Sequence, residues 1–296
     1  MLLVYGHPAT QLLRLWEKFD VKAIMLNAFQ LSKSKKLMNM LESGKTLREV
    51  MGIPDEVEIW LDSGGYQALR RGIVLDPDNV VKWYNTIKPD YCVALDSPVA
   101  PNDKNARKKV ERNVSVAKYM AERVECSLLP VYHPVSPELL ERYVEGYSEV
   151  GERVAVGGLI PRILTVKNAS RKEGWEFLKL MRSVEGRWLH ALGLGSALLI
   201  PKLSALGYQS ADTQTWRHKA AYGKIMLPGR GERHITDREV NFGRKKIEDH
   251  ELVEALSIAR ALGFTWEELR NDFKKRAIFN AYVLHLVSAS AGGVQH

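Results

Sequence analysis

The sequence of 296 residues has little cysteine and no long hydrophobic run. Its two cysteines, Cys92 and Cys126, cannot form a disulfide framework in a chain of this length, and they are too few for a zinc site with three or four cysteine ligands. This composition is typical of a reducing cytoplasm, where we expect the protein to reside. Because no stretch of about 18 apolar residues occurs and the first residues lack the regions of a signal peptide, we expect no membrane association.

Charge of one sign is in excess. Lysine and arginine total 43 against 35 aspartate and glutamate residues, which gives a net charge of +8. Such an excess suggests a polyanionic partner, although a basic enzyme without such a partner has the same composition. Hydrophobic residues make up 45% and charged residues 26% of the chain, an ordinary balance for a globular protein.

Short apolar runs alternate with amphipathic stretches along the chain, which predicts a parallel α/β fold. The apolar runs lie at residues 23–26, 57–61, 91–95, 128–132, 154–156, 188–192 and, more weakly, 208–211. The amphipathic stretches lie at residues 79–88, 104–123, 137–149, 172–184 and 197–206. Six or seven such units fit a (β/α)8 TIM-type barrel with a short C-terminal helical extension.

Two domains are expected, a barrel over residues 1–245 and C-terminal helices packed on it over residues 246–296. The second part contains helical patterns at residues 249–262 and from residue 265 to about 288. Thr265 with Glu268 three residues later predicts a capping box at the start of the second helix.

Aspartates follow three of the predicted strands, at Asp62, Asp96 and Asp212. In a parallel barrel the carboxyl ends of the strands form one rim, where such carboxylates can act as acid, base, nucleophile or ligand-binding group. The simpler interpretation of each one alone is an N-cap for the next helix. Three aspartates around one rim favour a catalytic or ligand-binding site.

Other strand ends offer groups that can bind a ligand. Residues 62–67 (DSGGYQ) combine glycines that let a ligand approach the backbone with a tyrosine ring for stacking, although a tight turn with a packed tyrosine has the same pattern. The pair Gly157 and Gly158 offers backbone N–H groups. His133 at a strand end is a better candidate than His190, which we interpret as a core histidine inside an apolar run.

Basic and aromatic residues are interleaved after Asp212, a pattern that suits phosphate contacts and base stacking. A solvated basic loop is the alternative. The predicted nucleic-acid-binding residues are Trp216, Arg217, His218, Lys219, Lys224, Arg230 and Arg233.

Together these motifs resemble the tRNA-guanine transglycosylase superfamily, TIM-barrel enzymes that exchange guanine in a nucleic acid for a 7-deazaguanine. Residues 61–67 (LDSGGYQ) resemble its (T/L)DSGG(F/Y)Q signature, and residues 156–159 match its VGGL string. Weaker similarities occur, in the family's order, at residues 27–31, 95–98, 193–196 and 210–212. The resemblance covers about residues 20 to 225.

The resemblance implies roles for individual residues. Asp212 would be the nucleophile that attacks C1′ of the sugar, Asp62 the general acid and base, and Asn27 the residue that orients Asp212. Asp96 would bind the amidine edge of the base and Tyr66 would stack on it. The remaining base-binding residues would be Ser63, Gln67, His133, Gly157, Gly158 and Leu159.

The sequence also departs from that family. No cysteine follows Cys126, and Phe279 stands where the zinc-binding histidine would lie, so we expect no metal and no cofactor. Residues 213–219 replace the family's PTRxxRxG tract, and we expect no RNA-binding appendage of the kind that archaeal members add. These departures resemble the zinc-less divergent branch that includes 7-deazaguanine DNA transglycosylases, and they favour DNA slightly over tRNA.

The expected partners are therefore a nucleic acid, DNA or tRNA, and a free 7-deazapurine base. A homodimer is a further expectation, because family members often dimerise. Two alternatives stay open: a non-catalytic nucleic-acid-binding subunit on the same barrel, and an unrelated barrel enzyme that acts on a phosphorylated metabolite.

Overall fold

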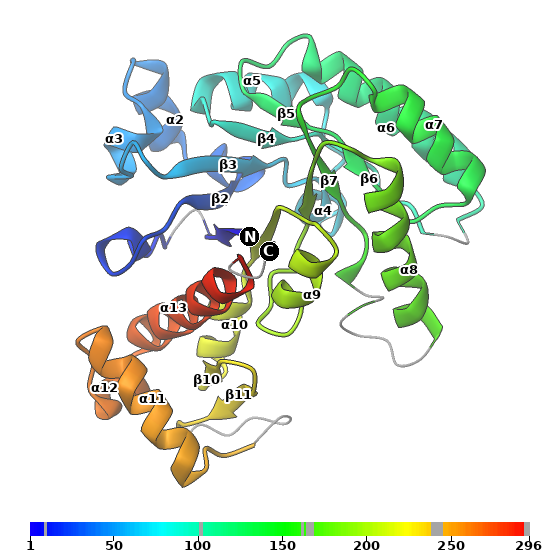
Figure 1. The fold of residues 1–296 in the computed structure, drawn as a ribbon. Helices are drawn as coiled ribbons and strands as arrows, with labels where there is room; N and C mark the ends of the chain where they lie inside the picture. Colours follow the sequence, from blue (N-terminus) through cyan, green and yellow to red (C-terminus); the bar gives the residue numbers. More distant parts are fainter. Residues whose placement is uncertain (9–10, 101–102, 161–162, 164–168, 238–244, 293–296) are drawn as a thin grey trace.

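Parallel strands surrounded by helices form the centre of the molecule (Figure 1). The computed structural model describes residues 1–8, 11–100, 103–160, 163, 169–237 and 245–292. Nine strands pair in the order β5-β4-β3-β2-β1-β9-β8-β7-β6. Their bounds are β1 Leu2–Gly6, β2 Ala23–Asn27, β3 Glu58–Asp62, β4 Tyr91–Val93, β5 Ser127–Leu129, β6 Val131–Tyr132, β7 Arg153–Val156, β8 Trp188–Ala191 and β9 Ser210–Thr213.

The two outer members of this order, β5 and β6, are pieces of one stretch of chain separated only by Pro130. Proline has no N–H to donate to a neighbouring strand, so it interrupts the ladder. β5 pairs with β4 and β6 pairs with β7, while the Pro130 carbonyl accepts a hydrogen bond of 2.9 Å from the Ala155 N–H. The ring of strands therefore closes through this segment, which confirms the predicted (β/α)8 barrel.

Helices follow most strands and cover the outside of the barrel (Figure 1). The five predicted barrel helices are present as α5 Pro77–Ile87, α6 Ala106–Ala121, α7 Pro137–Tyr147, α8 Ala169–Val184 and α9 Ile200–Ala205. Further helices were not predicted because they are short: η1 Leu15–Glu17, α1 Ala28–Leu31, α2 Lys35–Glu42, α3 Leu47–Met51, α4 Gly65–Leu69 and α10 Thr215–Ala221.

Two layers of apolar side chains bury the strands on both faces. The barrel interior holds Val4, Ala23, Met25, Trp60, Val93, Leu129, Val131 and Ala155. A larger cluster fills the space between the strands and the surrounding helices. Burial on both faces explains why the strands are apolar runs rather than alternating patterns.

Two strand regions were not predicted from the sequence. β1 lies between β2 and β9 and is needed to complete the ring. The strands β10 Lys224–Leu227 and β11 Gly231–His234 form an antiparallel hairpin inside the basic tract after Asp212, where we predicted no strand.

The C-terminal helices are α11 Asp249–Ala261, α12 Trp266–Asn271 and α13 Phe273–Gly292. The capping box at Thr265 is confirmed. The single helix predicted from residue 265 is interrupted at Asp272, whose backbone is extended (φ −104°, ψ 115°). Its Oδ1 accepts a 2.7 Å hydrogen bond from the Lys274 N–H, so this residue caps the helix that follows.

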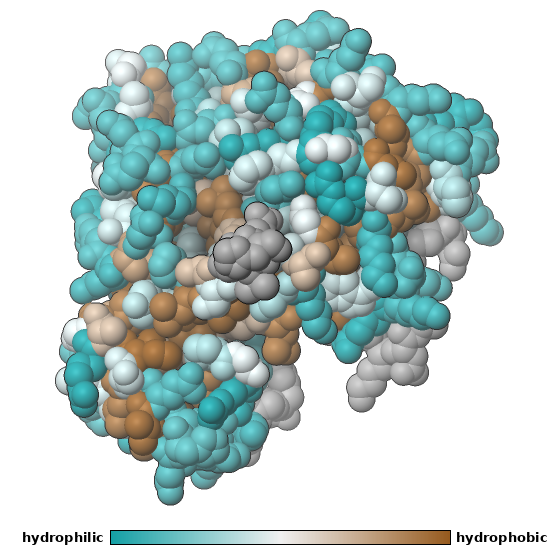
Figure 2. Space-filling view, viewed as in Figure 1, coloured by the Kyte–Doolittle hydropathy of each residue, from teal (hydrophilic) through white to brown (hydrophobic). Residues whose placement is uncertain are grey.

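α13 holds the hairpin and α10 to the barrel. Asn280 accepts a hydrogen bond from the Met226 N–H (2.7 Å) and donates to the carbonyls of Trp216 (3.1 Å) and Lys224 (3.0 Å). The predicted domain boundary at residue 245 therefore lies between elements that bind each other directly, the hairpin and α10 on one side and α13 on the other. The division into two domains stays a prediction. Figure 2 shows that hydrophilic residues cover most of this face, with hydrophobic residues gathered over the C-terminal helices.

Cys92 in β4 and Cys126 just before β5 are joined by a disulfide, with 6.2 Å between their Cα atoms. The expectation of a cytoplasmic location therefore loses the support that a reducing environment gave it. Among the helices of the described residues, none is long and apolar enough to cross a membrane.

Candidate active site

Three carboxylates gather at the carboxyl end of the barrel. Asp62 ends β3, Asp212 lies in β9, and Asp96 follows β4. Burial, together with the negative charges of Asp96 and then Asp212, raises the pKa of Asp62 from 3.8 to about 7. A carboxyl group with this pKa exists in both protonation states near neutral pH, as a group that gives and takes a proton requires.

Neutral donors hold Asp62. Its Oδ2 accepts hydrogen bonds of 3.1 Å from Asn27 Nδ2 and of 3.1 Å from the Gly64 N–H. Gly64 has φ +80°, and a Cβ there would lie 2.5 Å from Asn27 Oδ1, so only glycine fits this turn. The prediction that Asn27 orients Asp212 is wrong. Asn27 is in register with Asp62 on the adjacent strand, whereas β1 separates β2 from β9.

Asp212 has different donors, both on Oδ1. The Gly193 N–H donates at 2.6 Å, and His190 Nε2 lies at 3.2 Å. His190 is fully buried and was interpreted from the sequence as a core histidine, so its contact with Asp212 was missed. The signal was present: Ser210 and Asp212 are two residues apart on one face of β9, and His190 pairs in register with Ser210.

Asp96 has a third kind of partner. Its Oδ2 lies 2.5 Å from His133 Nε2. His133 is 2% exposed, and no described residue is a hydrogen-bond partner of its Nδ1. A Cβ at Gly158 would come within 3.0 Å of that Nδ1, so the glycine leaves room beside the imidazole.

The remaining predicted base-binding residues surround the same end of the barrel. Ser63 is buried and accepts a 3.2 Å hydrogen bond from the Gly65 N–H. Tyr66 on α4 is 60% exposed, so its ring is available for stacking, and the buried Gln67 Oε1 has no partner among the described residues. After β7, Gly157 and Leu159 are buried, while Gly158 is exposed.

The predicted nucleic-acid surface is contradicted in part. Trp216, Arg217, Lys224 and Arg233 are buried at 0%, 8%, 2% and 4% exposure. Internal partners occupy the three cations: Gln11 binds Arg217, Glu232 binds Lys224, and Glu251 binds Arg233.

These four side chains support the packing of α10, the hairpin and α11, and they are wrong as phosphate contacts. His218 and Arg230 are exposed, and Lys219 is half-exposed and pairs with Glu232 at 2.5 Å. Arg230 lies 3.8 Å from Glu254. These three residues stay candidates.

The residues do not fit the zinc site of the tRNA-acting enzymes. Both cysteines are in the disulfide, and Phe279 is fully buried in the apolar core. Across the described part of the chain, no group of three or more histidine, cysteine, aspartate or glutamate residues is arranged to hold a metal ion.

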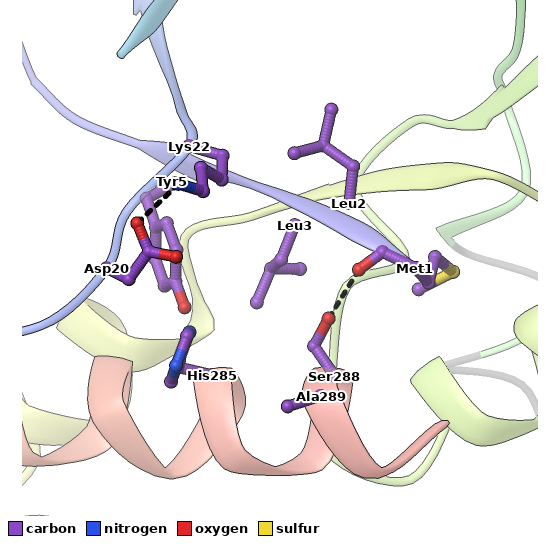
Figure 3. Close-up of a pocket in the computed structure, with 9 residues that line it drawn as sticks. All are labelled: Met1, Leu2, Leu3, Tyr5, Asp20, Lys22, His285, Ser288 and Ala289. Carbon is purple, nitrogen blue, oxygen red and sulfur yellow. Dashed lines mark hydrogen bonds and ion pairs between the residues drawn. The ribbon is translucent and has the colours of Figure 1, made fainter. Parts of the chain in front are cut away.

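A separate pocket lies at the opposite end of the barrel, where β1 begins (Figure 3). Its polar groups bind one another: Lys22 pairs with Asp20 at 2.7 Å, and Ser288 donates to the Met1 carbonyl at 2.5 Å. This end of a barrel serves stability rather than catalysis, so the carboxylate rim is the better candidate site.

Known proteins resemble this chain over most of its length. A relative described as uncharacterized protein 306, from Sulfolobus islandicus rod-shaped virus 1, is 25% identical over 77% of this chain and 70% of its own length. The tRNA-guanine(15) transglycosylases of Nanoarchaeum equitans and Methanosphaera stadtmanae are 26% and 24% identical over 72% and 93% of this chain. The matches span only 52% and 39% of those two enzymes.

The model of the family described as queuine tRNA-ribosyltransferase matches residues 7–258. That range includes every strand of the barrel except β1, and all three aspartates of the rim. The chain therefore belongs to the queuine tRNA-ribosyltransferase family.

Proposed function

We propose that this protein is a guanine transglycosylase that exchanges guanine in a nucleic acid for a 7-deazaguanine through a covalent aspartyl intermediate. The observation that carries the proposal is the pairing of Asp62, with its pKa of about 7, with a second carboxylate, Asp212, at the same barrel rim. One group can carry the proton while the other attacks.

In the first step, a carboxylate oxygen of Asp212 attacks C1′ and the bond from C1′ to N9 of guanine breaks. The bonding electrons leave with the base, which takes a proton from Asp62. In the second step, the incoming base gives its N9 proton to Asp62, and its nitrogen displaces Asp212 from C1′. The second step restores both carboxyl groups, and no water is consumed.

The remaining rim residues suit a purine. His133 occupies Asp96 Oδ2, which leaves Oδ1 to accept N–H groups from the amidine edge of the base. The exposed ring of Tyr66 offers a stacking face. The target nucleotide has to leave its stack to reach this site.

The two alternatives have less support. A non-catalytic subunit has no need for three carboxylates at one rim. A phosphate site at residues 193–196 would need free backbone donors, but the Gly193 and Gly195 N–H groups already donate to the carboxylate and the carbonyl of Asp212.

The proposal favours DNA slightly over tRNA as the polymer. The tract that follows the nucleophile in the tRNA-acting enzymes is replaced at residues 213–219, and the zinc ligands are missing. The archaeal relatives are named for activity on tRNA, and the relative from the virus carries no activity in its name.

The test is exchange of labelled guanine into tRNA and into double-stranded DNA. We expect the wild type to label one of the two polymers, and D212N to label neither. D55N removes an exposed carboxylate away from the rim and serves as the matched control. If the wild type labels neither polymer, or if D212N labels as well as the wild type, the proposed mechanism is wrong.

The base is identified by a second experiment. Each polymer is treated with enzyme and a set of 7-deazaguanines, and its nucleosides are then analysed by mass spectrometry. Incorporation into DNA alone supports the preference stated above, and incorporation into tRNA alone overturns it.

A further inference from the structure

A row of hydrogen-bonded polar side chains extends from Asp212 into the barrel. Asp212 Oδ1 lies 3.2 Å from His190 Nε2, and His190 Nδ1 lies 2.9 Å from Ser210 Oγ. Trp188 Nε1 donates to the same Ser210 Oγ at 2.8 Å. This row connects the rim to Trp188, the first residue of β8, through side chains that face the barrel interior.

The chemistry of the indole fixes the direction of the first of these hydrogen bonds and constrains the other two. An indole N–H can only donate, so Ser210 Oγ must accept from Trp188. If the Ser210 hydroxyl then donates to His190 Nδ1, the proton of a neutral imidazole stays on Nε2 and is donated to Asp212. In the opposite tautomer, the Nε2 lone pair would face the carboxylate and the Ser210 proton would lose its acceptor.

We propose that Trp188 and Ser210 set the tautomer of His190, so that His190 and Gly193 together hold Oδ1 of Asp212 and present Oδ2 to the sugar. Both hydrogen bonds that the described residues make to this carboxylate end on Oδ1. Oδ2 is therefore the oxygen left for attack. His190 is a positioning residue, and this role rests on the proposed function, since it matters for catalysis only if Asp212 is the nucleophile.

Packing holds the imidazole in this arrangement. His190 is fully buried, and its ring lies 4.8 Å from the ring of Trp60 at an interplanar angle of 39°. Trp188 is itself held by the guanidinium of Arg153, 4.4 Å from its ring. A Phe at position 188 would keep the ring and this contact while removing the N–H.

The first test needs no substrate. Protein labelled with 15N-histidine is studied by NMR, and the His190 signals are identified by their loss in H190Q. We expect the Nε2–H tautomer in the wild type and a shift toward the Nδ1–H tautomer in W188F.

The matched control is W216F, which removes a buried indole N–H that has no hydrogen-bond partner among the described residues. It should leave the His190 tautomer unchanged. A wild-type Nδ1–H tautomer, or an unchanged tautomer in W188F, overturns the proposal whether or not the protein has exchange activity.

The second test uses the exchange reaction. We expect W188F to lower kcat about tenfold with an unchanged KM for the free base, since the residue acts on the nucleophile through two hydrogen bonds. H190F should lower kcat about 100-fold, and H190Q, whose amide can donate to Asp212, should recover part of that loss. Equal kcat values for W188F and the wild type, or for H190Q and H190F, contradict the positioning role. A wild type without any exchange activity would instead refute the proposed function.

Discussion

Replacing Asp62 with asparagine should stabilise the folded protein at neutral and alkaline pH while abolishing exchange. Burial and the charges of Asp96 and Asp212 raise the pKa of this carboxyl group from 3.8 to about 7. Between these two values the folded protein keeps a proton that the unfolded chain has released. Stability therefore falls as the pH rises through this window.

The size of the effect follows from the same shift. A rise from 3.8 to about 7 corresponds to roughly 4 kcal/mol of lost stability above pH 7. Asparagine has no charge to bury, and its carbonyl oxygen can accept from the same donors, Asn27 Nδ2 and the Gly64 N–H, that hold Asp62. We expect D62N and the wild type to be similarly stable near pH 4, and D62N to gain about 1.4 kcal/mol per pH unit up to pH 7.

The assay is urea unfolding of both proteins at intervals from pH 4.5 to 8.5, with D55N as a control for the loss of one negative charge. The compared quantity is the difference in the free energy of unfolding between D62N and the wild type at each pH, because other groups that titrate in this range affect both proteins. A difference between D62N and the wild type that stays constant across the series would refute the assignment of the proton to Asp62.

Three further predictions concern the surroundings of the site. Reduction of the bond between Cys92 and Cys126 should lower the free energy of unfolding by about 4 kcal/mol, because the bond closes a loop of 34 residues; urea unfolding with and without reductant measures this. G64A should reduce exchange at least tenfold and lower the melting temperature, since the new methyl group would displace Asn27; a variant with wild-type activity contradicts this. R230A should weaken nucleic-acid binding and reduce the slope of log K against log salt concentration by the amount expected for about one phosphate contact. An unchanged slope would remove this residue from the interface.

The fold could be predicted from the sequence to the extent that its strands are buried on both faces. Such strands are short apolar runs, and their alternation with amphipathic helices is visible without any contact information. β1 was missed because one short run at the start of a chain has no preceding helix to mark it. The hairpin β10–β11 was missed because its cations suggest a solvated loop, whereas Lys224 and Arg233 are buried against Glu232 and Glu251. Such pairing is a tertiary property.

The sequence predicts which carboxylates form the site, but it does not predict which residues bind each of them. The position of Asp62, Asp96 and Asp212 after strands places them at one rim by the geometry of parallel barrels alone. Which residue contacts which carboxylate depends on strand order and register. The family resemblance assigned Asn27 to Asp212, whereas Asn27 is in register with Asp62 because β2 lies beside β3.

The partners also decide where the proton of the three carboxylates resides. Asp96 and Asp212 each face an imidazole ring nitrogen that can donate a hydrogen bond, from His133 and His190 respectively. The donors that the described residues offer to Asp62 are all neutral, the Asn27 amide and the backbone N–H groups of Gly64 and Ser63, and the charges of both other carboxylates act on it. Because three neighbouring carboxylates cannot all stay ionised without cost, the proton belongs on the one that lacks an imidazole. This assignment explains why the acid and base of the proposed exchange is Asp62 and why Asp212 is left as the nucleophile.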